Sequence, residues 1–201
     1  MTGRATPPGD PGSGLRRDRA PVGDAETCAA VRVLTAAFAA DPVIRWLTPE
    51  ISARMFAFVV AESAAAGGLE VQDEVAAAVW LPWSASGSTP GPATGGLPPE
   101  LPVRLGQYLE LTTARHPSDR DHLYLQFLGV HPARQGQGAG SALLARGLAR
   151  ADAAGLPAYL EASGQANLRL YERHGFVPYG DPILLPDGPA VRPMWRVPKI
   201  I

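Results

Sequence analysis

The sequence predicts a single α/β domain in which helices flank a mixed sheet. Two observations carry this prediction. Apolar, strand-like runs alternate with segments of helical periodicity, and two closing strands form a hairpin late in the chain. The length of 201 residues, of which 46% are hydrophobic, is enough for one core of ordinary size.

The N-terminal segment differs in composition from the rest of the chain. Residues 1–13 are rich in Pro, Gly and polar side chains, which bury little apolar surface. We therefore expect a disordered extension here, followed by a domain that spans residues 14–201. A short first strand at residues 15–19 has only a weak signal.

Two helices are expected next. Asp24 is a suitable capping residue, and the apolar positions after it predict a helix to about residue 39. Residues 48–50 read Thr-Pro-Glu, which combines a capping hydroxyl, a first-turn proline and an acid near the positive end of the helix. They predict a second helix that stops at Gly67.

The middle of the chain predicts a hairpin, a long loop and a third helix. Residues 69–71 and 75–81 are apolar and flank a polar turn, as in a β-hairpin. Residues 82–99 are almost entirely Pro, Gly, Ser, Thr and Ala and predict a flexible loop. Residues 100–115 are amphipathic and predict a helix.

Strands and helices alternate in the second half. Residues 122–130 are bulky and mostly apolar, as in a buried strand. After them, apolar residues recur at helical spacing, at Leu143, Leu144, Leu148 and Ala151. A strand is expected near residues 158–161, a helix near residues 165–174, and two closing strands after them.

Composition excludes several classes of protein. The net charge of −1 argues against a nucleic-acid partner, which usually requires a basic surplus. The single cysteine, Cys28, cannot form an internal disulfide, and we expect it to be a small buried residue of the first helix. No apolar run reaches the ~18 residues of a membrane span, and residues 1–19 lack the core of a signal peptide, so a cytoplasmic protein without membrane contact is expected.

A glycine-rich turn is the most informative motif. Residues 130–144 read Val-His-Pro-Ala-Arg-Gln-Gly-Gln-Gly-Ala-Gly-Ser-Ala-Leu-Leu and connect the strand at 122–130 to the following helix. Gly136, Gly138 and Gly140 leave backbone N–H groups accessible at the positive end of that helix. This arrangement binds phosphate or pyrophosphate.

Two better-known glycine motifs fit less well. A P-loop needs Gly-Lys-Ser/Thr, but the only lysine is Lys199. A dinucleotide fingerprint needs a third glycine where Ser141 stands, although Glu161 lies at roughly the distance of its ribose-binding acid. The dinucleotide interpretation is weakened and stays open.

Two segments of the chain resemble one family. Gln135-x-x-Gly138-x-Gly140, after Val130-His131-Pro132, resembles the pyrophosphate loop of the GCN5-related N-acetyltransferase (GNAT) family, which holds coenzyme A. The segment from Asn167 through Tyr171 to Gly175-Phe176 resembles a second motif of these enzymes. More narrowly, residues 36–42, 76–82, 125–143, 155–163 and 186–189 resemble the puromycin N-acetyltransferase group and its actinobacterial relatives.

The resemblance implies a GNAT-type, mostly antiparallel mixed sheet and acetyl-CoA as cosubstrate, without a metal. It places the pantetheine beside residues 128–130, and the pyrophosphate is expected on the backbone N–H groups of residues 135–140. The implied coenzyme A ligands are Leu128, Gly129, Val130, Gln135, Gly136, Gln137, Gly138, Ala139, Gly140, Ser141 and Asn167.

Two residues are candidates for catalysis. Tyr171 matches the tyrosine that relatives use as general acid, and a phenol with a pKa near 10 can protonate a leaving thiolate. Its alternative role is to pack with Phe176 in the core. Glu161 is a lone acid in an apolar strand, so it either draws a proton from the amine through water or forms a structural ion pair.

The acceptor pocket is assigned by resemblance and by neighbouring side chains. Asp41 and Trp46 lie where relatives bind the acceptor, although Asp41 is equally suited to cap a turn with Pro42. Tyr124 and Phe127 line the same cleft or belong to the core. The loop at 82–99 is either a flap over this pocket or a featureless connection. His116 and His122 lack a zinc spacing, so no metal is expected.

The leading hypothesis is an N-acetyltransferase that moves the acetyl group of acetyl-CoA to a primary amine of a small molecule. Direct attack in a ternary complex is the expected mechanism, and antibiotics and other natural products are among the acceptors. Acetylation of a protein N-terminus or lysine is an alternative, and a non-catalytic acyl-CoA-binding module is another. A monomer and a homodimer are both compatible with the sequence.

Overall fold

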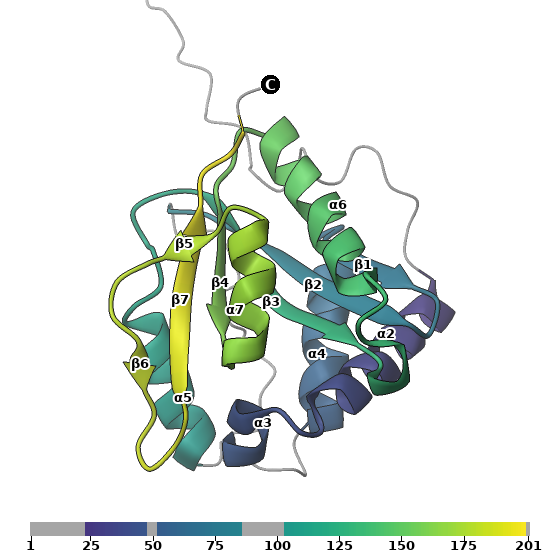
Figure 1. The fold of residues 1–201 in the computed structure, drawn as a ribbon, viewed down its shortest axis with the longest axis horizontal. Coiled ribbons are helices and arrows are strands. Elements are labelled where there is room, and N and C mark those ends of the chain that lie inside the picture. Colours follow the sequence, from purple (N-terminus) through teal and green to yellow (C-terminus); the bar gives the residue numbers. More distant parts are fainter. Residues whose placement is uncertain (1–22, 48–51, 86–102, 200–201) are drawn as a thin grey trace, which may run out of the picture.

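The computed structural model describes residues 23–47, 52–85 and 103–199, and these form one α/β domain (Figure 1). The expected extension at 1–13, the weak strand at 15–19, the helix start at 48–50 and most of the loop at 82–99 lie outside the described residues.

A mixed sheet is the centre of the fold, and its strand order is β1-β2-β3-β4-β7-β5, with β6 also paired to β7. The strands are β1 (Leu69–Gln72), β2 (Ala76–Trp83), β3 (His122–Val130), β4 (Ala158–Ala162), β5 (Val177–Pro178), β6 (Ile183–Leu184) and β7 (Ala190–Arg196). Among the strands that the structure describes, β3 and β4 pair in parallel and every other pair is antiparallel, which confirms the expected fold class.

Helices cover both faces of this sheet (Figure 1). They are α2 (Asp24–Phe38), α3 (Pro42–Leu47), α4 (Ser52–Ala65), α5 (Val103–Thr113), α6 (Ala139–Ala153) and α7 (Gln165–Arg173), with a 3₁₀ turn η3 at Pro132–Arg134. Because side chains alternate along a strand, β2 serves two cores. Ala76, Ala78 and Trp80 pack with α6 and α7, whereas Ala77 and Val79 pack with α2, α3, α4 and α5.

The strands β3 and β4 pair over only part of their length. Their parallel register runs from Leu123 to Leu125 on β3, although β3 continues to Val130 and stays paired to β2 (Figure 1). A β-bulge marks the point of divergence, since Val79 and Trp80 of β2 pair with Phe127 and Leu125 and leave Gln126 between them. Beyond this point the two strands separate, and the sheet opens.

Three sequence expectations need correction. Residues 42–47, expected as a turn, form the short helix α3, whose first residues are capped by Asp41. Strand β2 continues through Trp83, so the loop begins later than residue 82. Pro82 is tolerated because β1 begins at Leu69, opposite Val79, and does not pair with the part of β2 that contains Pro82. Cys28 is exposed because the buried stripe of α2 follows Ala29, Ala30, Val33 and Leu34 instead.

Ion pairs that each include a buried strand residue tie α6 to β1 and to β7. Glu70 of β1 is 4% exposed and accepts from Arg146 at 2.9 Å and Arg150 at 3.0 Å. Arg196 of β7 is also 4% exposed, and each of its two terminal nitrogens donates a hydrogen bond to an Asp152 carboxylate oxygen at 2.8 Å. The ion pairs compensate the charges of Glu70 and Arg196. They also fix the position of α6, the helix that follows the glycine-rich turn.

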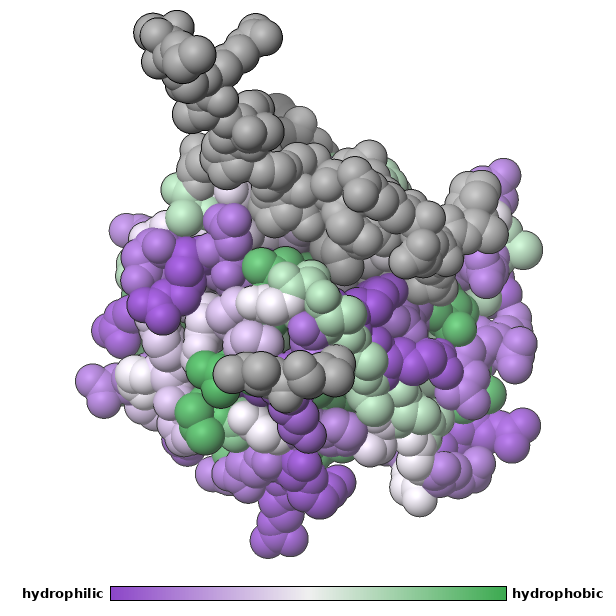
Figure 2. Space-filling model, turned by 90° about the horizontal axis from the view of Figure 1, so that it is seen from above, coloured by the Kyte–Doolittle hydropathy of each residue, from purple (hydrophilic) through white to green (hydrophobic). Residues whose placement is uncertain are grey.

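Apolar side chains are concentrated inside the domain. On the face seen from above, hydrophobic residues form small separate patches between hydrophilic ones (Figure 2). No helix among the described residues combines the length and apolar character needed to cross a bilayer.

Two helical glycines give a matched test of the packing. A Cβ at Gly147 of α6 would lie 2.3–2.5 Å from three ring atoms of Trp80, which is 1% exposed. We expect Gly147→Ala to lower the free energy of unfolding by about 1–3 kcal/mol, the usual cost of overpacking. Gly106→Ala in α5 has no neighbour within 4 Å and should instead raise it by about 0.5–1 kcal/mol. Urea denaturation of both variants measures the difference, and a gain in stability at Gly147 would contradict the packing.

Candidate functional site

A cavity occupies the place where β3 and β4 separate, and its lining comes from both faces of the sheet. Tyr171 and Asn167 of α7 line it from one face, and side chains of α2, α3, α4 and α5 line it from the other. The α2–α5 wall is mainly apolar and includes Phe38, Val43, Ile44, Leu47, Met55, Phe58, Val59, Leu105 and Leu109. The gap in the sheet thus connects two compartments of different chemistry.

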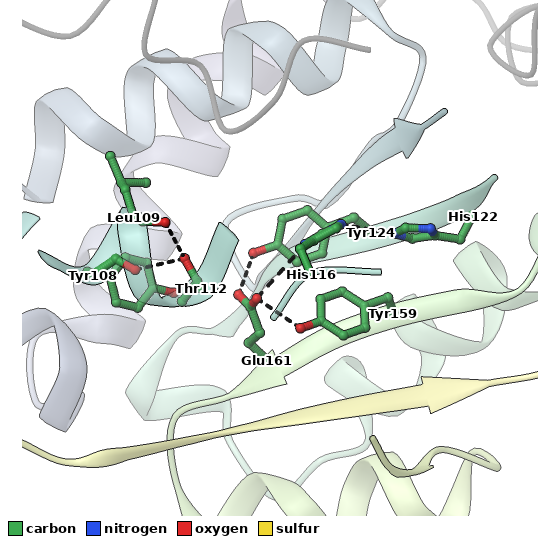
Figure 3. A network of polar contacts seen from close by, with 8 residues as sticks. All are labelled: Tyr108, Leu109, Thr112, His116, His122, Tyr124, Tyr159 and Glu161. Carbon is green, nitrogen blue, oxygen red and sulfur yellow. Dashed lines mark hydrogen bonds and ion pairs between the residues drawn. The ribbon is translucent and has the colours of Figure 1, made fainter. Parts of the chain in front are cut away.

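The polar end of the cavity is built around Glu161 of β4. Its carboxylate accepts hydrogen bonds from the Tyr124 hydroxyl at 2.8 Å and the Tyr159 hydroxyl at 3.0 Å (Figure 3). The Glu161 side chain is 3% exposed, and burial raises its pKa while the two tyrosine hydrogen bonds oppose that rise. Burial and the Glu161 charge raise the pKa values of Tyr124 and Tyr159, so both phenols stay protonated.

Two histidines continue the network away from Glu161 (Figure 3). Nδ1 of His116 lies 4.0 Å from Oε1 of Glu161, and its Nε2 lies 3.0 Å from Nε2 of His122. Nδ1 of His122 is 2.9 Å from the carbonyl oxygen of Arg120, and the ring of Trp83 lies 4.0 Å from that of His116. Burial lowers the pKa of both histidines, that of His116 to about 3, so both rings are neutral at neutral pH.

Asp41 serves both roles considered for it. Its Oδ1 accepts from the backbone N–H groups of Val43 at 2.9 Å and Ile44 at 3.1 Å, which caps α3. Its Oδ2 accepts from the Ser163 hydroxyl, and both residues line the cavity. Helix capping therefore holds an acid at the cavity wall.

Tyr171 divides its contacts between the core and the cavity. Its ring packs edge-on against Phe176, with centroids 6.0 Å apart. Its hydroxyl makes no hydrogen bond to a described residue, and Tyr171 is among the residues that line the cavity. Burial, together with the Asp41 charge, raises its pKa, so the hydroxyl retains its proton. Asn167 lies one helical turn earlier and lines the same cavity.

The glycine-rich turn has the backbone geometry that its sequence predicts. Gly136 and Gly138 have φ values of +75° and +85°, and Gly138 is the N-cap of α6. The N–H groups of residues 136–141 have no acceptor among the described residues. Unpaired N–H groups at the start of a helix are suited to bind an anion. Gly140 packs closely on Val130, where a Cβ would lie 3.1 Å from Cγ2.

Side chains on either side of this turn hold its ends. The Gln135 side-chain amide donates to the Val130 carbonyl at 3.3 Å, which closes the turn onto the end of β3. The Ser141 hydroxyl lies 2.7 Å from Nε2 of His174, which follows α7. These contacts connect the turn to the strand and to the helix that carries Tyr171.

The structure brings seven of the seventeen candidate residues to one cavity, and residues 135–141 of the glycine-rich turn are not among them. Those that line it are Asp41, Tyr124, Phe127, Leu128, Glu161, Asn167 and Tyr171. Gly129 instead faces α2, where a Cβ would lie 2.9 Å from Ala37 and Leu34, and the Val130 side chain packs with α6. The structural ion pair considered for Glu161 is absent among described arginines, since its oxygens are engaged by tyrosines.

Trp46 lies outside this cavity, contrary to expectation. Its indole N–H donates to the Pro186 carbonyl at 2.9 Å, and the Arg104 guanidinium lies 5.3 Å from its ring. It is 6% exposed and packs in the core beneath the β6–β7 turn. Trp46 therefore stabilises α3 rather than the acceptor pocket.

Several polar residues of the site had no assignment from the sequence. His116, His122 and Tyr159 complete the network around Glu161, and Ser163 binds Asp41. The spacing of His116 and His122 excluded a zinc site but gave no sign of their mutual contact. Among the described residues, no group of three or more His, Cys, Asp or Glu is arranged to hold a metal ion.

Comparisons with known proteins agree with this geometry. Residues 102–176, which include the glycine-rich turn and Tyr171, match the sequence model of the acetyltransferase (GNAT) family. A Corynebacterium glutamicum structure described as histone acetyltransferase HPA2 and related acetyltransferase is 28% identical, covering 90% of this chain and 96% of its own, with a TM-score of 0.59.

Two more distant structures share the fold. The Drosophila melanogaster polyamine N-acetyltransferase is 19% identical over 88% of this chain and 97% of its own, with a TM-score of 0.62. The Aedes aegypti arylalkylamine N-acetyltransferase 2 is 12% identical over 90% of this chain and 98% of its own, with a TM-score of 0.64. The family model thus matches residues 102–176, and all three structures share the fold of this chain.

The buried histidine predicts a specific dependence of stability on pH. His116 has a pKa of about 3 when folded and 6.5 when unfolded, so below pH 6.5 the unfolded state binds the extra proton. The contribution of the neutral His116 ring to the free energy of unfolding is therefore fully present above pH 6.5. Below that pH the free energy of unfolding falls by about 1.4 kcal/mol per pH unit, down to about pH 3. Denaturation between pH 5 and 7.5 should show a shallower slope for His116→Gln than for the wild type. Arg115→Gln, an exposed neighbour, should keep the wild-type slope, and equal slopes for all three would contradict the neutral buried ring.

Proposed function

We propose that this protein transfers the acetyl group of acetyl-CoA to a primary amine of a small molecule, by direct attack in a ternary complex. One observation carries the proposal. The cavity between β3 and β4 is lined from both faces of the sheet, and its lining includes an acid, Glu161, and a phenol, Tyr171, whose hydroxyl has no hydrogen-bond partner among the described residues. A thioester and an amine can therefore approach one another from opposite sides.

The cofactor side fits coenzyme A. The free N–H groups of residues 136–141 suit a pyrophosphate, and the positive end of α6 adds to this attraction. Beyond Leu125, the edge of β3 that faces away from β2 pairs with no strand in the described part of the chain, so its backbone groups are available to the amide groups of pantetheine. We assign the pantetheine to residues 128–130, of which Leu128 also lines the cavity.

The acceptor side favours an amine that carries a positive charge. Of the described residues that line the cavity, two are acids, Asp41 and Glu161, and none is lysine or arginine. An ammonium group is attracted to this end because the surrounding wall is apolar and screens charges weakly. The apolar residues of α3, α4 and α5 suit an acceptor with an aliphatic or aromatic body.

In this proposal Tyr171 is the general acid. Its hydroxyl is unpaired among the described residues and keeps its proton, so it can donate to the thiolate as the carbon–sulfur bond breaks. Asn167 would hold the cofactor or an ordered water beside it. Glu161 would bind the ammonium group and so position it for the loss of its proton.

The identity of the acceptor is proposed at the level of a class. The resemblance of residues 155–163 and 186–189 to the puromycin N-acetyltransferase group favours a natural-product amine, antibiotics included. The polyamine and arylalkylamine enzymes named above share the fold with this chain, and amines are the acceptors that their names state. A deep cavity of this kind suits a small molecule better than a folded protein surface.

An amine panel with a matched variant tests the proposal. Purified protein, acetyl-CoA and primary amines are mixed, free thiol is followed, and mass spectrometry detects the gain of one acetyl group. We expect Tyr171→Phe to reduce turnover by about 10²-fold or more, since general acid catalysis contributes this much, with acetyl-CoA affinity nearly unchanged. If no amine in the panel is acetylated, the proposed function is wrong. Turnover near the wild-type value in the variant would leave Tyr171 as a core residue only.

The glycine-rich turn gives a second test, on the cofactor alone. Gly138 has a φ of +85°, which β-branched residues rarely adopt, and its N–H belongs to the row that faces the anion. Gly138→Val should weaken acetyl-CoA binding tenfold or more, about 1.4 kcal/mol, as measured by calorimetry. Gly106→Ala serves as the control, because Gly106 lies in α5, far along the chain from the turn. Unchanged affinity in a folded Gly138→Val protein would remove the turn from the cofactor site.

A further inference from the structure

We infer that His116 is a further catalytic residue, whose Nδ1 accepts the proton of the acceptor ammonium, and that His122 is a positioning residue that keeps this nitrogen unprotonated. The inference rests on the proposed function and deepens it, since it assigns the base. It comes from a chain of contacts that leads from the backbone carbonyl of Arg120, through two buried rings, to the cavity. The two rings are those of His122 and His116 (Figure 3).

The contacts determine which ring nitrogens carry protons. The Arg120 carbonyl oxygen can only accept, so Nδ1 of His122, at 2.9 Å, must carry a proton. In a neutral ring the Nε2 of His122 is then unprotonated and accepts. The partner at 3.0 Å, Nε2 of His116, must therefore be the donor, which leaves Nδ1 of His116 with a free lone pair.

This free nitrogen lies where an acceptor amine would be bound. His116 is among the residues that line the cavity, and its Nδ1 is 4.0 Å from Oε1 of Glu161. That separation is too long for a hydrogen bond, and it brings the lone pair and the carboxylate to the same region. Both Glu161 oxygens already accept tyrosine hydrogen bonds, which makes the carboxylate the weaker candidate for the base.

The groups around His116 favour a protonated ring only when Glu161 is charged. Burial and the nearby His122 lower the pKa of His116, which keeps the ring free of a proton before the amine arrives. The Glu161 carboxylate acts in the opposite direction, because it would pair with the imidazolium at 4.0 Å. The other polar rings that face His116 are Tyr124 and Tyr159, and both are neutral phenols.

The proton balance of the reaction is complete with these residues. One N–H bond of R–NH₃⁺ breaks as Nδ1 of His116 takes the proton, and the amine lone pair forms the C–N bond to the thioester carbonyl carbon. The C–S bond breaks with its electron pair on sulfur, which takes the proton of the Tyr171 hydroxyl. A second proton, lost from nitrogen in the tetrahedral adduct, restores Tyr171. His116 then releases its proton to solvent, so each turnover yields amide, thiol and one proton.

His122 positions the ring of His116 and does not conduct the proton onward. Its Nδ1–H points at a carbonyl oxygen, which cannot take a proton at neutral pH. His122 is fully buried, and it can only fix the orientation and the tautomer of His116. This is the role that a second, orienting group has for a histidine base in other enzymes.

The experiment uses two amines that differ in charge. One has a pKa well above the assay pH and arrives as an ammonium ion; the other, a weakly basic amine of similar size, is already neutral. Gln at position 116 keeps an N–H donor toward His122 but has no basic nitrogen. We expect His116→Gln to lose about 10²-fold or more in kcat/KM with the ammonium substrate and little with the neutral one. Arg115→Gln should behave as the wild type with both.

A second measurement tests the tautomer without any substrate. Nitrogen NMR of the wild-type side chains should show His116 protonated at Nε2 only and His122 protonated at Nδ1 only. In His122→Phe we expect this preference at His116 to be lost, together with part of the activity toward the ammonium substrate. Activity toward the neutral amine should persist.

The outcomes separate the two proposals. Equal losses with both amines in His116→Gln, or a proton found on Nδ1 of His116 in the wild-type enzyme, would overturn the inference and leave the acetyltransferase proposal intact. If the wild type acetylates neither amine of this pair nor any member of the wider panel, the proposed function fails, and the role of His116 fails with it.

Discussion

The separation of β3 from β4 after Leu125 is the constraint on which the rest of the structure depends. It gives up backbone hydrogen bonds that a continuous parallel pair would make, and such a loss must be compensated elsewhere. The compensation comes from β2, which stays paired to β3 over its whole length, and from β7, which stays paired to β4. Two well-supported strands can thus part and hold a cavity open between them.

Local signals in the sequence predict the elements on either side of this gap well. The apolar run at 122–130 coincides with β3, because a strand buried on both faces needs no alternation and ends where glycine and proline begin. The turn with Gly136 and Gly138 was predictable for a similar reason, since a positive φ favours glycine. Asp41 and Pro42 also carry a helix-start signal, which the short length of α3 obscured.

Contacts between distant segments were not predictable from the sequence. The bulge at Gln126 depends on the register with β2, which no residue of β3 specifies alone. His116 follows α5 in an irregular segment, and its partner Glu161 is on another strand, so no periodicity relates them. Trp46 was assigned to the pocket by its position in the chain, whereas its orientation is set by the Pro186 carbonyl. The positions of these side chains are determined by packing between segments that are distant in the sequence.

The two cores on opposite faces of the sheet have a consequence for how such a protein changes over evolutionary time. The wall formed by α2, α3, α4 and α5 comes from chain that precedes Ala114, whereas the turn, α6 and α7 come from chain that follows β3. Mutations in the first stretch can reshape one compartment while the other keeps its sequence. The family match, which covers residues 102–176 and leaves out α2, α3 and α4, agrees with such uneven divergence. Under the proposed function, a change of acceptor amine would then require substitutions mostly in the residues before Ala114.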